Sequence, residues 1–330
     1  MSGAWFAEAF AHPVTRGIVG AVVAVLVAAA VAIEALARTG RVGPALAREL
    51  RLRLGSWCVL LPLMLGPVLA GRVATIAAVA VLALLCYREY ARATGLFRER
   101  LLSAVVVVAI LLQAFAALDH WYGFFVALWP LTAVALAVAT LPLDRPAGYI
   151  QRVALATLGF LLVGVGLMHL AFLANDPGYR PLALLLLTAV ALGDVAAFTF
   201  GKLVGGPKLL PATSPNKTIS GSLGSLATVT AVVALVASAI FEGTPMAAVH
   251  WLVLFGLLVG VAGQAGDLVL SSIKRDLGIK DIGAALPGHG GVLDRFNSLL
   301  LVAPAAFHLL KYVVGVADGA PVRVITGVAS

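Results

Sequence analysis

Charge is scarce in this sequence. Only 12% of its 330 residues are Asp, Glu, Lys or Arg, about half the usual share, whereas 62% are hydrophobic and the mean hydropathy is +1.05. A soluble chain of this length would need far more polar surface. The composition therefore excludes an ordinary soluble domain and indicates an integral membrane protein.

Cysteines and processing signals are also few. Cys58 and Cys86 stand alone inside apolar segments without metal-ligand spacing, so we interpret them as small hydrophobic side chains of the membrane interior. Arg16 precedes the first apolar run, which has no small-residue cleavage site and is followed by many more apolar runs. We therefore interpret that run as a membrane span and not as a removable signal.

Long apolar runs dominate what remains, and most approach the ~20 residues that a membrane-crossing helix needs. Their richness in Ala, Val, Leu and Gly favours closely packed helices over a barrel, so the expected fold class is an all-α, polytopic transmembrane bundle of about nine or ten spans. The second and third runs are short and admit a single kinked or re-entrant hairpin. The ten candidate spans are 17–37, 57–70, 73–87, 102–118, 122–142, 153–174, 181–201, 222–241, 247–270 and 298–316.

Positive charge is distributed unevenly between the two sides of this layout. Five alternate loops hold 18 of the 23 Lys and Arg residues: 38–56, 88–101, 143–152, 202–221 and 271–297. Because basic loops stay in the cytoplasm, we expect these five loops to face inward and both termini to face outward. We divide the chain into 1–100, N-terminal membrane helices with basic loops, and 101–330, a membrane helical domain with the catalytic loops 202–221 and 271–297.

Acidic residues inside membrane spans are costly and are candidates for function. Glu34 lies near the end of its span, where a side chain that reaches the interface is the simpler interpretation. Asp194 and Asp267 each lie a turn or two before a basic loop, at similar depth. Either acid alone fits a structural hydrogen bond between helices, but together they predict a polar cavity that opens toward the basic side.

The loop 202–224, KLVGGPKLLPATSPNKTISGSLG, combines lysines, hydroxyls and glycines. Lysines supply charge, hydroxyls and backbone amides supply donors, and glycines allow close approach, so this composition fits a polyphosphate cradle as well as a solvated loop. The loop contains no G-x-x-x-x-G-K-[ST] pattern, which excludes a Walker A site.

The stretch 271–298, SSIKRDLGIKDIGAALPGHGGVLDRFNS, gathers much of the remaining charge. Ser271, Lys274 and Arg275 follow Asp267 at helical spacings and continue its helix face. The glycines around His289 allow the chain to fold back and bring Asp294 beside Asp267. Two carboxylates beside lysine and arginine side chains that could bind phosphate favour Mg²⁺ over Zn²⁺ as the metal.

These residues resemble the phosphatidate cytidylyltransferases, also called CDP-diacylglycerol synthases. The resemblance spans residues 190 to 298 and rests on Ser271, Lys274-Arg275, Lys280-Asp281, Gly283, Pro287, His289-Gly290-Gly291 and Asp294-Arg295, preceded by GQAGDL (263–268) and SPNKT (214–218). The chain departs from the family pattern at two positions: Asn297 and Ser220 stand where the family usually has acids. The implied site carries up to two fewer negative charges.

The resemblance implies that a phosphatidate phosphate oxygen attacks the α-phosphorus of CTP, giving CDP-diacylglycerol and pyrophosphate in phospholipid synthesis. It implies Mg²⁺, with room for a second, monovalent cation. Its partners would be CTP, phosphatidate or a related lipid phosphate, and membrane lipids, with no nucleic acid; a homodimer is compatible with it. The expected location is the bacterial cytoplasmic (inner) membrane, with the active site facing the cytoplasm.

The implied site residues fall into three groups. Asp267, Asp294, Lys274 and Arg275 would be catalytic, and Asp267, Asp294 and Asn297 would hold the metal. The residues implied to bind substrate are Ser214, Lys217, Thr218, Ser271, Lys280, Asp281, His289, Gly290, Gly291 and Arg295.

Three alternatives remain open at this point. One is CTP-dependent transfer to another lipid phosphate or a lipid alcohol, because no residue identifies the acyl chains. Another is a non-catalytic family member, suggested by Asn297 and Ser220. The third is a transporter or channel with Asp194 and Asp267 as ion ligands, although the polar residues gather at one membrane face. The D-G-x-x-A-R element of CDP-alcohol phosphatidyltransferases is missing.

Overall fold

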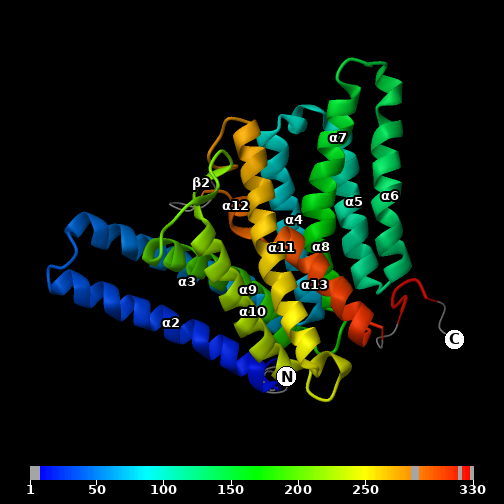
Figure 1. The fold of residues 1–330 in the computed structure, drawn as a ribbon. Coiled ribbons are helices and arrows are strands. Elements are labelled where there is room, and N and C mark those ends of the chain that lie inside the picture. Colours follow the sequence, from blue (N-terminus) through cyan, green and yellow to red (C-terminus); the bar gives the residue numbers. More distant parts are fainter. Residues whose placement is uncertain (1–7, 284–289, 319–321, 328–330) are drawn as a thin grey trace.

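The computed structural model describes residues 8–283, 290–318 and 322–327, and within them the protein is a helical bundle (Figure 1). Among these residues, nine helical segments are long and apolar enough to cross a membrane, and a shorter apolar helix follows them. The all-α fold class predicted from the sequence is confirmed. The helices of these ten segments are α2 (Pro13–Arg38), α3 (Pro44–Ala70), α4 (Arg72–Ala93), α5 (Arg100–Leu118), α6 (Tyr122–Ala139), α7 (Tyr149–Gly159) continued by a π-helical turn, η3 (Phe160–Val165), and α8 (Gly166–Leu173), α9 (Tyr179–Leu203), α10 (Ile219–Ile240), α11 (Val249–Asp276) and α13 (Leu299–Val314).

Short elements complete the described chain. Two strands, β1 (Lys208–Leu210) and β2 (Ser214–Thr218), form an antiparallel ribbon with Lys208 opposite Thr218 and Leu210 opposite Ser214. A five-residue helix, α12 (Val292–Phe296), precedes α13. Single 3₁₀ turns lie at η1 (Leu96–Arg98), η2 (Leu141–Leu143) and η4 (Pro245–Ala247).

The second and third predicted spans are two full helices, so the re-entrant hairpin is wrong. α3 begins at Pro44, because proline suits a first helical position, and most of the predicted loop 38–56 is therefore helical. α3 ends at Ala70, and Gly71 after it has a φ of 125°, a conformation that residues with a Cβ rarely adopt. α4 then starts at Arg72 in a new direction.

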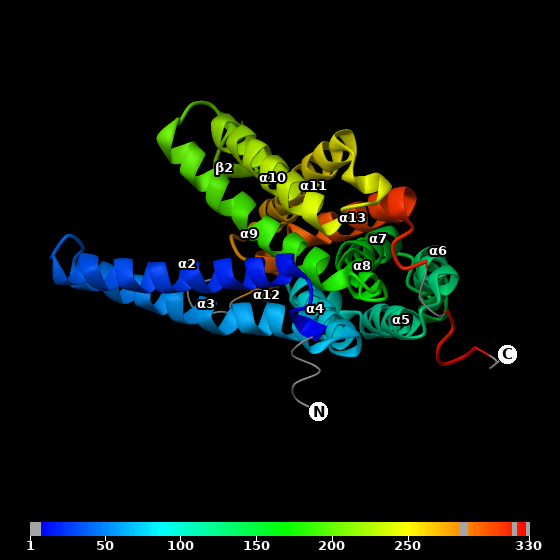
Figure 2. The ribbon, with the colours of Figure 1, turned by 90° about the horizontal axis from the view of Figure 1, so that it is seen from below.

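The helices divide into a buried centre and an exposed hairpin. Every residue of α8 is buried, and a Cβ added to Gly166 would lie 2.5 Å from the Leu300 carbonyl oxygen, which shows how closely α8 crosses α13. Within α2, Thr15 alone is buried. Figure 2 shows α2 and α3 running side by side away from the other helices. The site described below lies in the other part, at the end of the bundle where the ribbon, α12 and the C-terminal end of α11 meet (Figure 1).

Candidate active site

A cavity of about 630 Å³ lies among α9, α10, α11 and the ribbon. Asp194 from α9 and Asp267 from α11 both line it, as predicted from these two acids, and its opening toward the basic side stays a prediction. Its wall has an apolar part formed by Val190, Val229 and Val259. Its other polar lining residues are Lys202, Lys208, Asn216, Lys217, Thr218, Ser222, Ser225, Gln264 and Ser298.

The ribbon supplies Lys208 and Lys217 to the cavity lining, and α9 supplies Lys202. Thr218 ends β2 and starts α10, since its hydroxyl oxygen accepts a hydrogen bond from the Gly221 amide at 3.1 Å. This cap fixes the direction of the strand before it, which carries Lys217 and Ser214. The loop predicted at 202–221 is thus an ordered strand pair that runs into a helix.

α10 and α11 are joined across the cavity wall. The Gln264 side-chain amide donates to the Ser222 carbonyl oxygen at 3.1 Å, and the Ser222 hydroxyl donates to the Gln264 side-chain oxygen. Both residues line the cavity. The two bonds hold the ribbon end of α10 at a fixed place against α11, one turn before Asp267.

Asp267 is held by two different groups. One carboxylate oxygen forms an ion pair with the Lys217 ammonium, and the other accepts a hydrogen bond from the Asn297 side-chain amide at 2.6 Å. The Lys217 and Asp267 side chains keep 26% and 21% of their surface exposed. Because both line the cavity, an entering anion could take Lys217 from Asp267 without unfolding anything.

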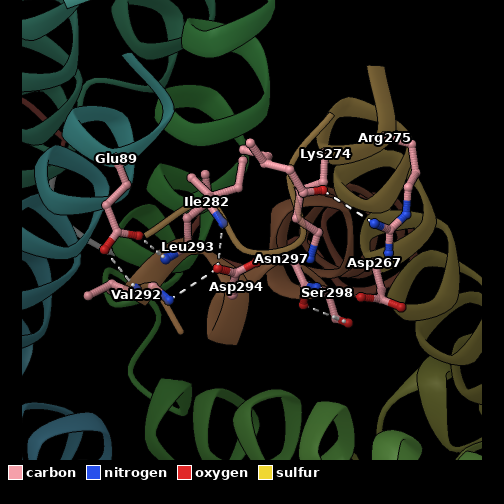
Figure 3. A network of polar contacts seen from close by, with 12 residues as sticks. Glu89, Asp267, Lys274, Arg275, Ile282, Val292, Leu293, Asp294, Asn297 and Ser298 are labelled. Carbon is pink, nitrogen blue, oxygen red and sulfur yellow. Dashed lines mark hydrogen bonds and ion pairs between the residues drawn. The ribbon is translucent and has the colours of Figure 1, made fainter. Parts of the chain in front are cut away.

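Asp294 has a more enclosed setting in α12. Its Oδ1 accepts from the Lys274 ammonium at 2.9 Å, and its Oδ2 accepts from the backbone amides of Ile282 at 2.9 Å and Gly291 at 3.1 Å (Figure 3). The Asp294 and Lys274 side chains are only 4% and 12% exposed. Within the described part of the chain, Asp267 belongs to the cavity lining and Asp294 does not.

Asn297 links these two settings. It follows α12 directly, donates to Asp267, and accepts a 2.7 Å hydrogen bond from the Ser298 amide through its side-chain oxygen. The carbonyl oxygen that the sequence offered to a metal is therefore directed at the backbone. The metal role predicted for Asp294 and Asn297 stays a prediction.

The remaining predicted residues are distributed around this core. Ser271 is buried on α11, and the Arg275 guanidinium donates to the Thr213 carbonyl oxygen at 3.2 Å, which ties the ribbon turn to α11. Gly291 immediately precedes α12, and Gly290, just before it, has a φ of 78°. Lys280, Asp281 and Arg295 lie on the exposed surface. His289 lies outside the described residues, so its predicted role stays a prediction.

Glu89 on α4 is a member of this region that the sequence did not reveal. Its two carboxylate oxygens accept from the backbone amides of Val292 at 3.0 Å and Leu293 at 2.8 Å (Figure 3). Glu89 precedes its partners by about two hundred residues and lies among the arginines of the 88–101 segment. No local pattern distinguishes it from a solvated acid of a basic loop.

The oxygen donors of the cavity fit Mg²⁺. Mg²⁺ in phosphate-binding sites is held by one or two carboxylates together with waters and substrate phosphates. Asp194 from α9 and Asp267 from α11 supply two carboxylates to the cavity lining. The donor set therefore suits a cation completed by bound phosphate.

Comparison with known proteins places the chain in a family. Residues 51–313 match the model of the cytidylyltransferase family. The uncharacterized protein YnbB of Escherichia coli K12 is 33% identical over 273 residues, 80% of this chain and 88% of that protein. The chain belongs to the cytidylyltransferase family. This confirms the resemblance inferred from the motifs.

Relatives with a named activity match a shorter part of the chain. The phosphatidate cytidylyltransferase of Staphylococcus saprophyticus is 41% identical over 143 residues, which cover 43% of this chain and 53% of that protein. The phosphatidate cytidylyltransferase of Bacillus subtilis is 44% identical over 119 residues, 36% of this chain and 42% of that protein. The chain thus spans about half the length of these relatives.

Proposed function

We propose that this protein is a phosphatidate cytidylyltransferase that converts CTP and phosphatidate to CDP-diacylglycerol and pyrophosphate. A lipid phosphate oxygen attacks the α-phosphorus of CTP, a new P–O bond forms there, and the bond from that phosphorus to the bridging oxygen breaks. Pyrophosphate leaves with that oxygen. The family membership and the named relatives support the nucleotidyl transfer.

One observation carries the choice of a lipid phosphate as acceptor. A single cavity combines an anion-binding end, with Lys217, Lys202 and Lys208, and an apolar wall on helices that are long enough to cross a membrane. A phosphate with an acyl tail has the same two parts. A freely soluble phosphate would need no apolar wall.

The side chains of the site divide the proposed work. Lys217 leaves Asp267 to bind a phosphate of CTP, and Arg275 adds positive charge in the last turn of α11. The catalytic role predicted for Lys274 stays a prediction, because its ammonium is paired with Asp294. The hydroxyls of Thr218 and Ser222 and the backbone of the ribbon orient the nucleotide. Transfer of this kind depends mainly on positioning and on neutralising charge.

Mg²⁺ is the proposed cofactor, and it would neutralise charge on the phosphates when bound. Asp267 would be its first protein ligand. The cavity supports Asp194 as the second, whereas the sequence motif favours Asp294 and Asn297. A further monovalent cation stays a prediction, as does a homodimer.

The five basic segments support an inward-facing site in the cytoplasmic membrane of a bacterium. Three of them contain site residues proposed here or Glu89: 88–101, 202–221 and 271–297. CTP is a cytoplasmic metabolite, so this orientation and the proposed substrate agree. Labelling of introduced cysteines in intact cells tests the orientation.

Purified protein in lipid vesicles tests the activity. With CTP, Mg²⁺ and phosphatidate, we expect pyrophosphate release and CDP-diacylglycerol detected by mass spectrometry, and neither product with Asp267→Ala. Product with a lipid alcohol or another lipid phosphate, but not with phosphatidate, would select the alternative acceptor. Absence of pyrophosphate release with every acceptor would favour a non-catalytic family member.

A further inference from the structure

Glu89 occupies the start of α12, although it belongs to a helix near the other end of the sequence. The first turn of a helix has backbone N–H groups without helical acceptors. In α12, two of these, from Val292 and Leu293, donate to the two oxygens of Glu89 at 3.0 and 2.8 Å. Asp294 accepts from the amide of Gly291 just before them. Bonds from an amide to a carboxylate are among the stronger hydrogen bonds in proteins.

The loop around α12 is also shaped to the Glu89 carboxylate. A Cβ added to Gly283 would lie 2.6 Å from Glu89 Oε1, and one added to Gly291 would lie 2.5 Å from Glu89 Oε2. Any other residue at either position would have to displace the carboxylate. Two glycines from separate parts of the loop therefore close around a single side chain of α4.

α12 is too short to hold its own position. A five-residue helix has little more than one turn of hydrogen bonds, and isolated helices of this length are unstable. Its placement must come from outside contacts. Glu89 fixes its first turn, and Asn297, just after its last residue, donates to Asp267 at 2.6 Å. A displacement at the first turn therefore moves Asn297 relative to Asp267.

We propose that Glu89 is a positioning residue for the transfer reaction, acting through α12 on Asn297 and Asp267. It does not touch the reacting atoms, since the described lining of the cavity does not include it. This inference rests on the proposed function. It extends the active site to α4, a helix outside the motif-bearing stretch 190–298.

The chemistry of the contact requires a carboxylate of this length. Two N–H donors need two acceptor oxygens, and glutamine offers one oxygen and an amide that faces an N–H group. Aspartate is shorter by one methylene and would leave both donors beyond hydrogen-bond distance. Glu89→Gln is therefore the mildest substitution that breaks the contact.

Kinetics with Glu89→Gln test the proposal, and Glu99→Gln is the matched control because Glu99 precedes α5 without a side-chain cap. We expect Glu89→Gln to lower kcat roughly 10- to 100-fold, since a displacement of about 1 Å can cost this much. KM for CTP should stay within about threefold, because the ribbon and Lys217 are untouched. Glu99→Gln should keep both constants.

Hydrogen exchange measures the positioning without using activity. In Glu89→Gln, amides of 290–298 should exchange faster, while those of α4 and α11 keep their protection. Faster exchange with an unchanged kcat would show a structural role only and would overturn the proposal. Unchanged exchange would overturn it as well.

A second variant covers the case in which Glu89→Gln does not accumulate. Gly283→Ala pushes on the carboxylate without removing it, because the nearest atoms to its added Cβ all belong to Glu89. It should lower kcat by itself and add no further loss in a Glu89→Ala background. Additive losses would overturn the contact. Turnover by the wild-type protein distinguishes failure of the proposed function from failure of the positioning role. If the wild-type protein does not convert CTP and phosphatidate, the proposed function is wrong. If it does, and Glu89→Gln has the same kcat, only the positioning role is wrong.

Discussion

Two lysine–aspartate ion pairs, Lys217–Asp267 and Lys274–Asp294, each include a residue of α11, and they differ in what surrounds them. Lys217–Asp267 borders a cavity and keeps about a quarter of its surface exposed, 26% and 21% for the two side chains. Lys274–Asp294 is 12% and 4% exposed, and two backbone amides saturate the second oxygen of Asp294. The first pair can exchange partners with a substrate, whereas the second holds a loop together.

From this comparison we infer that Asp267 serves catalysis and that Asp294 serves stability. A charge at a cavity wall can be neutralised by incoming phosphate or metal, so removing its partner leaves little strain. A charged side chain that is buried away from solvent cannot be neutralised in this way, so removing its ion-pair partner strongly destabilises the protein. The following predictions test this division, from the largest expected effect to the smallest.

Asp267→Ala should abolish most activity without unfolding the protein. We expect kcat to fall on the order of 10²- to 10³-fold, the usual scale for loss of one group that stabilises transition-state charge. The apparent unfolding temperature in detergent should change little, because Lys217 is left beside the cavity and can be hydrated. A large loss of thermal stability would place Asp267 in the structural class instead.

Asp294→Ala should show the opposite balance. It leaves Lys274 buried without its counter-ion and two backbone amides without an acceptor, a change that costs about 3–5 kcal/mol in comparable buried pairs. The unfolding temperature should fall by roughly 5 °C or more. If stability were unchanged and kcat fell as far as in Asp267→Ala, Asp294 would be a metal ligand, as the sequence motif suggests.

Much of this site could be predicted from the sequence, but not the difference between the two pairs. Helical spacing from Asp267 to Arg275 and the intramembrane placement of Asp194 were readable along the chain, because a helix repeats its geometry locally. The role of Glu89 was not, since it depends on α4 packing beside a loop about two hundred residues away. The burial of Asp294 likewise depends on Ile282 and Gly291 closing over it. The start of α3 at Pro44 was missed because its arginines hid the helical continuation.

Asn297→Asp tests whether the cavity pair depends on the amide between the two settings. The new carboxylate would replace a donor 2.6 Å from Asp267 Oδ1 with a like charge, and only a cation could relieve the repulsion. The Mg²⁺ concentration that gives half-maximal activity should fall roughly tenfold, the scale expected for one added charge near a protein surface. Without Mg²⁺ the variant should unfold at a lower temperature than wild type.

Asn297→Ala is the control for this substitution, because it removes the amide without adding charge. It should leave the Mg²⁺ dependence close to that of wild type. An equal Mg²⁺ shift in both variants would show that the lost hydrogen bond, and not the added charge, sets the cation requirement.

Lys217→Met should weaken nucleotide binding more than it affects stability. A hydrogen bond to a charged group is worth about 1.5–3 kcal/mol, so KM for CTP should rise roughly tenfold or more. The unfolding temperature of Lys217→Met should be nearly unchanged. Lys274→Met should lower it, because the enclosed Asp294 carboxylate would lose its counter-ion. Equal unfolding temperatures for the two methionine variants would contradict the division drawn between the pairs.

Glu34→Gln should have the smallest effect on catalysis. Glu34 forms a two-pronged ion pair with Arg51 at 2.8 and 3.0 Å, but both side chains are about half exposed on the α2–α3 hairpin. Exposed pairs contribute little, and this one lies outside the cavity lining, so kcat and KM for CTP should stay within about twofold. α2 and α3 do contact α9, the helix that carries Asp194. A loss of activity beyond about fivefold would therefore mean that the α2–α3 hairpin sets the position of α9, and that this exposed hairpin is needed for catalysis as well as the cavity.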